Sequence, residues 1–328
     1  MPTECVIGID LGGTNLKAAA LDPALTTLAR AQRVIAGLEL EPLLAAIADV
    51  VEEVRRGAAT QAGAEATAVG FGIPCLIDAE SGVAVYSTHL PIVDLQFADA
   101  MAERLTLPVF VDNDAHVAML AELRHGAAQG ASVAAMLTLG TGVGGALAFG
   151  GELQRGAQGT GGELGHIIVD PDGPDCGPGC PGHGCLEALV GGTALARDAR
   201  KAAQENPDSA LGRALAAGRQ IDGALVGELA RDGDEVARAT LERLGGWLGI
   251  GIVTIVNALN PDVVVVGGGV AAAGELILAP ARAVLAARGL PTSARHAEIR
   301  AAHFGADAGV VGAAVLARES LARTTVAA

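Results

Sequence analysis

Short apolar runs, broken by glycine, proline and polar residues, dominate the first third of the chain. Runs of about four to eight apolar residues between such breaks predict buried strands. The first two, residues 5–11 and 16–21, flank a Gly-Gly-Thr break and predict the strands of a hairpin. A further strand and a helix from Pro42 to Arg56 follow. Residues 69–78 predict a strand that runs into a Gly/Pro turn, and residues 108–112 a strand that ends in polar residues where a helix begins.

The rest of the chain repeats this pattern and adds helices. Residues 136–148 again predict strand, glycine-threonine turn and strand, an internal repeat of the opening hairpin. A buried strand is predicted at residues 167–169, and a fully buried strand that ends in three glycines at residues 261–266. Helical patterns cover the segments 186–204, 210–243 (one or two helices), 244–259 and 306–322.

Composition and charge limit the class of protein. The chain has 328 residues, of which 51% are apolar, so it is long enough for two ordinary domains and too apolar for disorder. Its net charge of −15 repels phosphate backbones and anionic membranes, so we expect neither nucleic acid nor a membrane as partner. The apolar run 244–259 is short and interrupted by glycine, and no basic segment precedes the first strand. We therefore expect a cytoplasmic protein with reduced thiols.

Three glycine-rich turns are candidate phosphate or nucleotide contacts. Backbone N–H groups in such turns can face an anion, and Asp10 at a strand end could hold Mg2+ through water. A plain hairpin turn is the alternative for the first turn. A P-loop is excluded because its lysine is missing. We expect ATP and Mg2+ to be bound by residues of these turns: Asp10, Gly12, Gly13, Thr14, Lys17, Gly140, Thr141, Gly142, Gly267, Gly268 and Gly269.

Polar residues at the ends of two strands are candidates for chemistry. Asp114 could accept a proton from a substrate hydroxyl and Asn113 could bind neighbouring hydroxyls, whereas helix capping is the alternative role for Asp114. His89 lies in a loop after a strand and could contact a substrate or be merely solvated.

The segment 161–187 concentrates polar and metal-binding residues. Glu163 and His166 flank a glycine-rich turn that could aim both side chains the same way. Three cysteines in C-x3-C-x4-C spacing could wrap a structural zinc ion, with His166 or His183 as the fourth ligand. A loop with incidental thiols and a disulfide are the alternatives. The cysteines are Cys176, Cys180 and Cys185.

Several motifs together resemble one family. The chain contains IDLGGTN, VDNDA, LGTGVGGA, RGAQGTGGELGHIIVDPDGP, GCLE and NPDVVVVGGG in order between Gly8 and about Leu316. In this it resembles the ROK family of bacterial sugar kinases and related repressors, and most closely the family's glucokinases. The first strand starts by residue 5, without a preceding helix-turn-helix, so the resemblance implies a kinase. It also implies an α/β, actin-like ATPase (ribonuclease H-like) fold. The expected domains are residues 1–114 and 115–304, which close on a cleft, with a C-terminal helix (305–328) packed on the first.

The resemblance also implies roles for individual residues. Asp114 matches the family's catalytic base, and its sugar ligands are matched by Asn113, Glu163, His166 and Glu187. His166 in such proteins also binds zinc with the three cysteines. The Gly12 and Gly140 turns match the phosphate loops, and Gly267 to Gly269 match the adenosine contact. We also expect Gly72 and His89 to contact the sugar.

The chain departs from the family's pattern near the expected sugar site. Its cysteine spacing is C-x3-C-x4-C where C-x-C-x4-C is usual, Cys75 stands where glycine is common, and His89 stands where asparagine is common. Glucose, converted to glucose 6-phosphate, is the expected substrate. Another sugar (N-acetylmannosamine, N-acetylglucosamine, fructose or allose) or a cyclitol is the alternative. A non-catalytic sugar or ATP sensor and an actin- or chaperone-like ATPase are the rival classes. The resemblance implies a homodimer or homotetramer.

Overall fold

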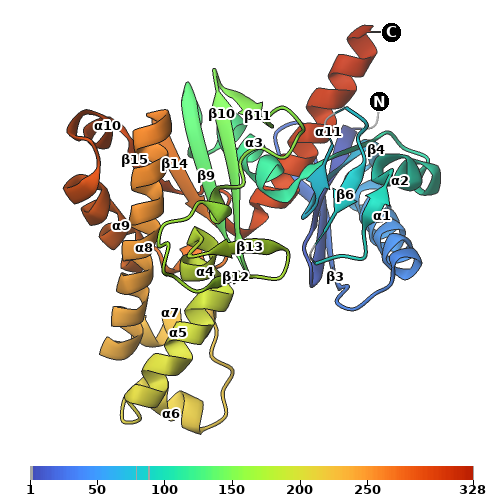
Figure 1. Cartoon of the computed structure of the whole chain (residues 1–328). Coiled ribbons are helices and arrows are strands. Elements are labelled where there is room, and N and C mark those ends of the chain that lie inside the picture. Colours follow the sequence, from blue (N-terminus) through green and yellow to red (C-terminus); the bar gives the residue numbers. More distant parts are fainter. Residues whose placement is uncertain (1–2, 79, 88, 328) are drawn as a thin grey trace. The chain divides into compact units, whose positions relative to one another are not determined.

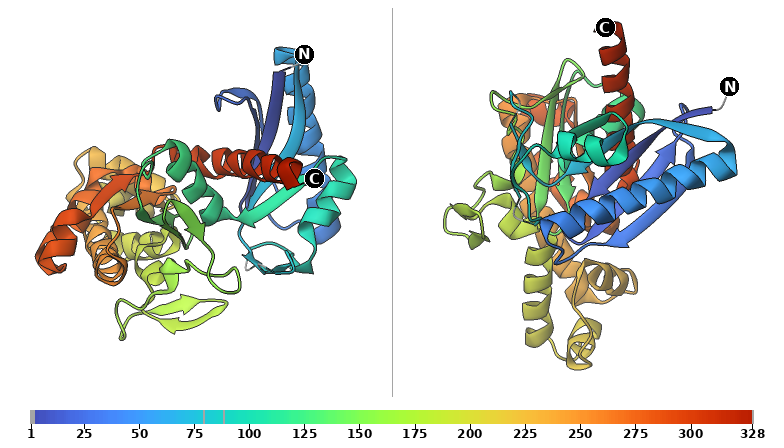
Figure 2. Two further views of the ribbon diagram at one scale, coloured as in Figure 1. Left: turned by 90° about the horizontal axis from the view of Figure 1, so that it is seen from above. Right: turned by 90° about the vertical axis from the view of Figure 1, so that its right-hand side faces the viewer.

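The computed structural model describes residues 3–78, 80–87 and 89–327 (Figures 1 and 2). The chain forms two compact units. Unit 1 comprises residues 1–129, 153–161 and 307–328, and unit 2 comprises residues 130–152 and 162–306. The division therefore falls at other residues than the 114/115 boundary expected from the sequence, because the helix after residue 113 belongs to unit 1.

Unit 1 is built on a five-stranded sheet with the order β3-β2-β1-β4-β8. The strands β1, β2 and β3 are antiparallel, whereas β4 and β8 run parallel to β1. Their bounds are β1 Thr3–Leu11, β2 Asn15–Leu21, β3 Thr27–Val34, β4 Ala64–Ile73 and β8 Val109–Asn113. A small antiparallel sheet adds β5 Leu76–Ile77, β6 Ala84–Tyr86 and β7 Val93–Leu95. The parallel strands end together, which gathers their terminal residues at one edge.

Helices pack on the unit 1 sheet, and two glycines set how closely one of them approaches. The helices are α1 Leu40–Ala62, α2 Phe97–Leu105, α3 Asp114–His125 and α11 Ala308–Ala327. A Cβ on Gly8 would overlap the carbonyl oxygen of Val310, and one on Gly70 would overlap that of Ala313. Since side chains alternate between the faces of a sheet, Ile7 and Ile9 point to the opposite face and join the core with α1. Figure 2 shows α1 (blue) running along the sheet.

Unit 2 repeats the arrangement with a sheet of the order β11-β10-β9-β14-β15. Its strands are β9 Val133–Leu139, β10 Val143–Phe149, β11 Glu152–Gln154, β14 Val263–Gly267 and β15 Glu298–Ala301. As in unit 1, a hairpin (β9–β10) is followed by a parallel neighbour (β14). The internal repeat predicted from the two glycine-threonine turns is thus present as two sheets with the same strand order.

Helices make up much of the remainder of unit 2. They are α4 Leu186–Val190, α5 Gly192–Glu205, α6 Ala210–Ala216, α7 Gly223–Arg231, α8 Glu235–Leu259, α9 Glu275–Arg288 and α10 Pro291–His296. The central helix α8 is long and apolar enough to cross a membrane by length and composition, but 56% of that stretch is buried inside the protein. It packs against α9, where Gly245 and Gly249 bring the two backbones close together. The apolar run that the sequence assigned to a buried helix is therefore the C-terminal part of α8.

Two sequence predictions in unit 2 are wrong. Residues 167–169 do not form a buried strand: Ile168 is 60% exposed and makes an isolated bridge to Cys185 after the short 3-10 helix η1 Leu164–His166. The single helix predicted at 186–204 is two helices, which meet at Gly191. The break allows the start of α5 to reach the β9–β10 turn, where the Gly192 N–H donates to the Gly140 carbonyl at 2.8 Å.

Candidate active site

The carboxyl ends of β1, β4 and β8 bring three candidate segments side by side. The strand register places Asp10 opposite Gly72 and places Gly72 opposite Asp112. Gly72 is required here by packing, since a Cβ would overlap Val117 Cγ2 in the first turns of α3. The register therefore brings the start of α3, with Asn113 and Asp114, beside the end of β1. Gly72 lies against α3, and its expected contact with sugar stays a prediction.

Asn113, and not Asp114, caps α3. The Asn113 Oδ1 accepts hydrogen bonds from the N–H groups of Ala115 (2.9 Å) and His116 (3.3 Å), while its Nδ2 donates to the Cys75 carbonyl at 3.3 Å. Asp114 occupies the first position of the helix, where its Oδ1 accepts from the adjacent Ala115 N–H at 2.9 Å. The capping role considered for Asp114 is thus taken by its neighbour, which leaves the second oxygen of Asp114 for other chemistry.

Burial raises the pKa of two neighbouring carboxyl groups of unit 1, Asp10 and Asp114. Burial raises the pKa of the Asp114 carboxyl above its ordinary value, and the charges of His116 and His89 oppose this rise. Burial, followed by the charge of Asp114, raises the pKa of Asp10 to about 6, and Lys17 lowers it. The Lys17 Nζ lies 4.0 Å from Asp10 Oδ2. Raised carboxyl pKa values in one cluster are typical of acid-base or metal-binding sites.

The first glycine turn and the loop that carries His89 lie together. Gly12, Gly13 and Thr14 connect β1 with β2, and the Gly12 N–H donates to the Asn15 carbonyl at 2.9 Å. A Cβ on Gly13 would lie 2.7 Å from His89 Cβ, so the turn and His89 are in close contact. Unit 1 therefore gathers the expected base, the expected Mg2+ ligand, the first phosphate turn and His89.

A buried network next to Asp114 has no counterpart among the residues singled out in the sequence. The His116 Nδ1 lies 3.0 Å from Asp112 Oδ1 and its Nε2 lies 3.0 Å from the Gly161 carbonyl oxygen. The Arg155 Nε and Nη2 donate to Asp112 Oδ2 at 2.9 and 2.5 Å. Asp112 and His116 are spaced i, i+4 across a strand-helix junction, so the sequence could have indicated this pair. Nothing local marks Arg155 as a member.

The second glycine turn and the third line one cavity of about 700 Å3 in unit 2. Gly140 and Thr141 contribute from the β9–β10 turn, and Gly269 contributes from the end of β14. Gly267 ends the strand itself, and Gly268 has φ +88° with the backbone of Leu139 against it. Two of the segments predicted to bind a nucleotide therefore line one cavity. Gly267 and Gly268 form the tight turn that leads into it.

Glu187 is held by the same β9–β10 turn. Its Oε2 accepts a hydrogen bond from the Val143 N–H at 2.7 Å, and its Oε1 lies 3.8 Å from the Cys176 Sγ. A Cβ on Gly142 would overlap Glu187 Oε2. Gly142 therefore makes room for this carboxylate, and it does not line the cavity described above.

The three cysteines and His166 form a cluster that fits a metal ion. Their four ligand atoms all lie within 4.8 Å of one another. The Cys180 and Cys185 Sγ atoms are 3.9 Å apart, and the Cys176 Sγ is 3.4 Å from His166 Nδ1. A tetrahedral zinc ion would separate its ligands by about 3.8 Å between sulfurs and about 3.5 Å between sulfur and nitrogen, given bonds of about 2.3 and 2.0 Å. These two separations are therefore compatible with tetrahedral coordination of one ion.

The contacts of the cysteines and histidines bear on two of the alternatives for this segment, a disulfide and His183 as a ligand. All three thiols are free, and a sulfur separation of 3.9 Å is far from a disulfide bond. His183 turns away and pairs with Asp175 at 2.8 Å, so His166 is the histidine of the cluster. The wide cysteine spacing is accommodated by the hairpin of β12 Asp175–Gly177 and β13 Cys180–His183. The other face of His166 approaches Glu163, whose Oε2 lies 3.9 Å from Nε2.

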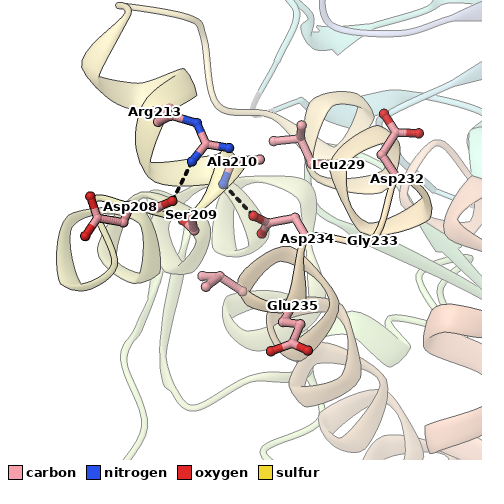
Figure 3. Close-up of a pocket in the computed structure, with 10 residues that line it drawn as sticks. Asp208, Ser209, Ala210, Arg213, Leu229, Asp232, Gly233, Asp234 and Glu235 are labelled. Carbon is pink, nitrogen blue, oxygen red and sulfur yellow. Dashed lines mark hydrogen bonds between the residues drawn. The ribbon is translucent and has the colours of Figure 1, made fainter.

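A second hollow in unit 2, of about 460 Å3, is lined by several carboxylates (Figure 3). Its central acid, Asp234, accepts hydrogen bonds from the N–H groups of Ala210 at 2.6 Å and Ala237 at 2.8 Å. Arg213 donates to the carbonyl of Asp208 across the rim. Asp234 thus caps α8 and also accepts a hydrogen bond from the start of α6. This acidic residue therefore has a structural role, because it holds the two helices together.

Comparison with known proteins identifies the family. The ROK family pattern matches residues 6–320. The chain is 33% identical to a glucokinase from Halalkalibacterium halodurans (97% of this chain, 96% of the relative) and 32% identical to one from Thermotoga maritima (98% and 99%). It is also similar to the crystal structure of a ROK family glucokinase from Streptomyces griseus in complex with glucose and AMPPNP, with a TM-score of 0.84, 35% identity and coverage of 96% and 99%.

The chain belongs to the ROK family. The resemblance stated from the motifs is therefore confirmed, as is the actin-like ATPase fold that it implied. The expected site residues fall into two sets by unit. Asp10, Lys17, Gly72, His89, Asn113, Asp114 and the first turn lie in unit 1, whereas Glu163, His166, Glu187, the cysteines and the two later turns lie in unit 2.

Proposed function

We propose that this protein is an ATP-dependent sugar kinase that converts glucose to glucose 6-phosphate. The observation that carries the proposal is the position of the Asp114 carboxylate. Asn113 caps α3 in its place, and Asp114 lies beside Asp10 and the Gly12 to Thr14 turn. Similarity over nearly the full length to glucokinases, one of them with glucose and an ATP analogue bound, supports both substrates.

In this proposal Asp114 accepts the proton of the attacking sugar hydroxyl. Phosphoryl transfer needs little covalent chemistry from a protein, so positioning and charge neutralisation dominate. Magnesium, when bound near Asp10, would supply the neutralising charge on the phosphates. The N–H groups of the Gly12 and Gly140 turns bind phosphate oxygens, and the cavity at Gly140, Thr141 and Gly269 accommodates the nucleoside.

The sugar hydroxyls are bound in this proposal by carboxylates, an amide and an imidazole. One carboxylate can accept hydrogen bonds from two adjacent hydroxyls, and charged acceptors strengthen both. We assign this role to Glu163 and Glu187, assisted by His166 and Asn113. Sites built to bind hydroxyls discriminate strongly against analogues that lack them.

A zinc ion held by His166 and the three cysteines is part of the proposal. Its chemistry would be structural, since it would fix the segment that ends two residues before Glu187 and would orient His166. We further propose that the protein is a cytoplasmic homodimer or homotetramer, for which light scattering after size exclusion is the test.

Cys75 and His89 favour one alternative substrate class. Burial raises the pKa of the Cys75 thiol to about 12, so this group is neutral, and its backbone carbonyl binds Asn113. His89 lies against Gly13 and influences the charge of Asp114. Because these side chains adjoin the expected base, a sugar with a different substituent, such as N-acetylmannosamine or a cyclitol, is the second candidate.

ADP release with Mg-ATP tests the proposal. The panel is glucose, mannose, fructose, allose, N-acetylglucosamine, N-acetylmannosamine and a cyclitol, with a no-sugar control for plain ATP hydrolysis. We expect kcat/KM to be highest for glucose, and Asp114→Asn to bind glucose normally while losing turnover. A silent panel with intact sugar binding would instead support a sensor, and sugar-independent hydrolysis would support an ATPase.

A further inference from the structure

The residues 153–161, here called the strap, form a loop that is closed at its base. The Gly161 N–H donates to the Arg155 carbonyl at 2.7 Å, and this bond pinches the two ends of the loop together. Gly156 and Gly159 have φ of +73° and +90°, which glycine adopts without strain. The strap belongs to unit 1 although the chain on both sides of it belongs to unit 2. Glu163 follows the strap by two residues.

Both ends of the pinch are held by the Asp112–His116 pair. Arg155 is held through its guanidinium on Asp112 Oδ2, and Gly161 is held through its carbonyl on His116 Nε2. Asp112 and His116 are 5% and 3% exposed, so water competes little for these bonds. Charge-assisted bonds of this kind are about twice as strong as neutral ones. The base of the strap is therefore fixed to the β8–α3 junction next to Asp114.

The two partners of His116 define its protonation. Asp112 Oδ1 and the Gly161 carbonyl oxygen are both acceptors, and each lies 3.0 Å from a ring nitrogen. A neutral imidazole has a single N–H and can satisfy one of them, whereas the imidazolium donates to both. A neutral His116 would direct a lone pair at an oxygen, and the strap would lose one of its two anchors.

We propose that His116 is a positioning residue for sugar binding, which acts as an imidazolium that anchors the strap and thereby orients Glu163. Loss of its proton at alkaline pH releases the Gly161 end of the strap and weakens sugar binding. This inference rests on the proposed kinase function for its link to sugar, but the anchoring itself does not.

The charges around His116 are consistent with this role. Burial lowers the pKa of His116, but the hydrogen bond and charge of Asp112 and the bond to Gly161 raise it above its ordinary value, against a smaller opposing effect of Arg155. Asp114, on the same helix turn, also interacts with the His116 charge. Two other elements pack on α3. On α11, Glu319 pairs with Arg124 near the far end of α3, and on β4 the carboxylate is that of Glu65, which is exposed near the start of the strand.

The decisive experiment needs no sugar. NMR of the protein labelled at histidine should show both ring nitrogens of His116 protonated at neutral pH, with loss of a proton only at alkaline pH. The His116 signals are assigned through backbone-to-side-chain correlations in the wild-type protein, and a neutral His116 at pH 7 would overturn the proposal. This measurement uses the wild-type protein, so it holds even if the variant fails to fold.

Trypsin reports on the anchor, because it cleaves after Arg155 within the strap itself. We expect cleavage at Arg155 to be slow in wild-type protein at neutral pH, to accelerate at alkaline pH relative to an unstructured substrate, and to be fast at all pH values in His116→Gln. The matched control His125→Gln should behave as wild type. Equal cleavage rates in wild type and His116→Gln, with both folded, would contradict the anchoring role.

Kinetics then link the anchor to the sugar. His116→Gln should raise the KM for glucose by about 10- to 100-fold, the usual effect of losing a group that orients a ligand residue, with a smaller change in kcat. The wild-type KM should rise with alkaline pH and that of the variant should not. Arg155→Lys should retain more sugar affinity than Arg155→Gln. If no variant or wild type turns over any sugar, the kinase proposal fails while the NMR and trypsin results still decide the anchor.

Discussion

Gly142→Ala tests whether Glu187 binds sugar, because it moves that carboxylate without changing it. The backbone at Gly142 is not in the left-handed region, so alanine is conformationally allowed. The added Cβ would overlap Glu187 Oε2 and lie 2.9 Å from its Cδ. Ordinary contacts between carbons begin near 3.5 Å, so the carboxylate has to move by at least about 0.6 Å. We expect that movement to weaken its 2.7 Å bond to the Val143 N–H and to displace the carboxylate from any bound hydroxyls.

The expected size follows from the bonds that are lost. A hydrogen bond to a charged group contributes about 1.5–3 kcal/mol, which corresponds to a rise of about 10- to 150-fold in the KM for glucose if Glu187 loses comparable bonds to hydroxyls. The assay is ADP release at saturating Mg-ATP with glucose varied. Gly246→Ala, the same exchange at an open position in α8, is the control.

A double-mutant cycle makes the test sharper. In a Glu187→Ala background the Gly142→Ala exchange should add little to the KM, because residues that act through one contact are not additive. An unchanged KM in folded Gly142→Ala protein would refute the assignment of Glu187 to the sugar. Full additivity in the cycle would show that the glycine acts through another group.

Three further results are expected. Gly246→Ala should stabilise the fold by about 0.5–1 kcal/mol, as alanine does over glycine in a helix. Gly249→Ala should destabilise it by about 1–3 kcal/mol, because its Cβ would lie 2.6 Å from Val284 Cβ. Urea unfolding compares the two variants, and equal effects would contradict the close packing of α8 on α9. Zinc should be present stoichiometrically by elemental analysis and absent from Cys180→Ser, with a lower melting temperature; wild-type protein that is fully stable after chelation would argue against a structural ion. Because burial raises the folded pKa of Asp114 above its unfolded value, this group stabilises the fold at pH values below its unfolded pKa, and that contribution is lost as pH rises through its folded pKa. Asp114→Asn should therefore melt higher than wild type at neutral pH while it lacks turnover, and kcat/KM of the wild type should fall with acid at a higher pH than an ordinary carboxyl would give; a lower melting point for the variant would contradict this.

The strands and the repeat could be predicted because a buried strand needs a continuous run of apolar residues, which can be recognised locally in the sequence. Runs such as residues 263–266 are apolar throughout, and a short strand buried on both faces suits them. The same rule failed at residues 167–169, where three apolar residues follow a glycine-rich turn but the chain bends toward the cysteine hairpin, leaving Ile168 exposed. In a run of only three residues, apolar composition does not determine the structure when the adjacent cysteine hairpin bends the chain.

Long-range contacts explain what the sequence did not reveal about the site. The break between α4 and α5 depends on the docking of Gly192 onto the Gly140 turn, more than fifty positions earlier in the chain. The role of Arg155 depends on Asp112, 43 positions away. Arg155 opens one of the motifs of the family resemblance, but that motif does not indicate a partner so far away in the chain. The cysteine cluster could be predicted because its three thiols lie within ten positions of one another.

The two sheets have the same strand order, but their first turns carry different chemistry. In unit 1, Asp10 stands two positions before the first glycine and pairs in register with Lys17. The equivalent position in unit 2 is Thr138, which pairs with Gly144. Both turns offer backbone N–H groups, but only the first adds a titratable pair. The duplicated fold thus supplies two glycine-rich turns, and only the first has a carboxylate at this position of its strand, Asp10, whose pKa the charge of Asp114 raises further. A turn in unit 2 with an acidic residue at Thr138 would place negative charge beside the cavity that we assign to the nucleotide. We therefore expect Thr138→Asp to weaken nucleotide binding if the assignment of that cavity is right.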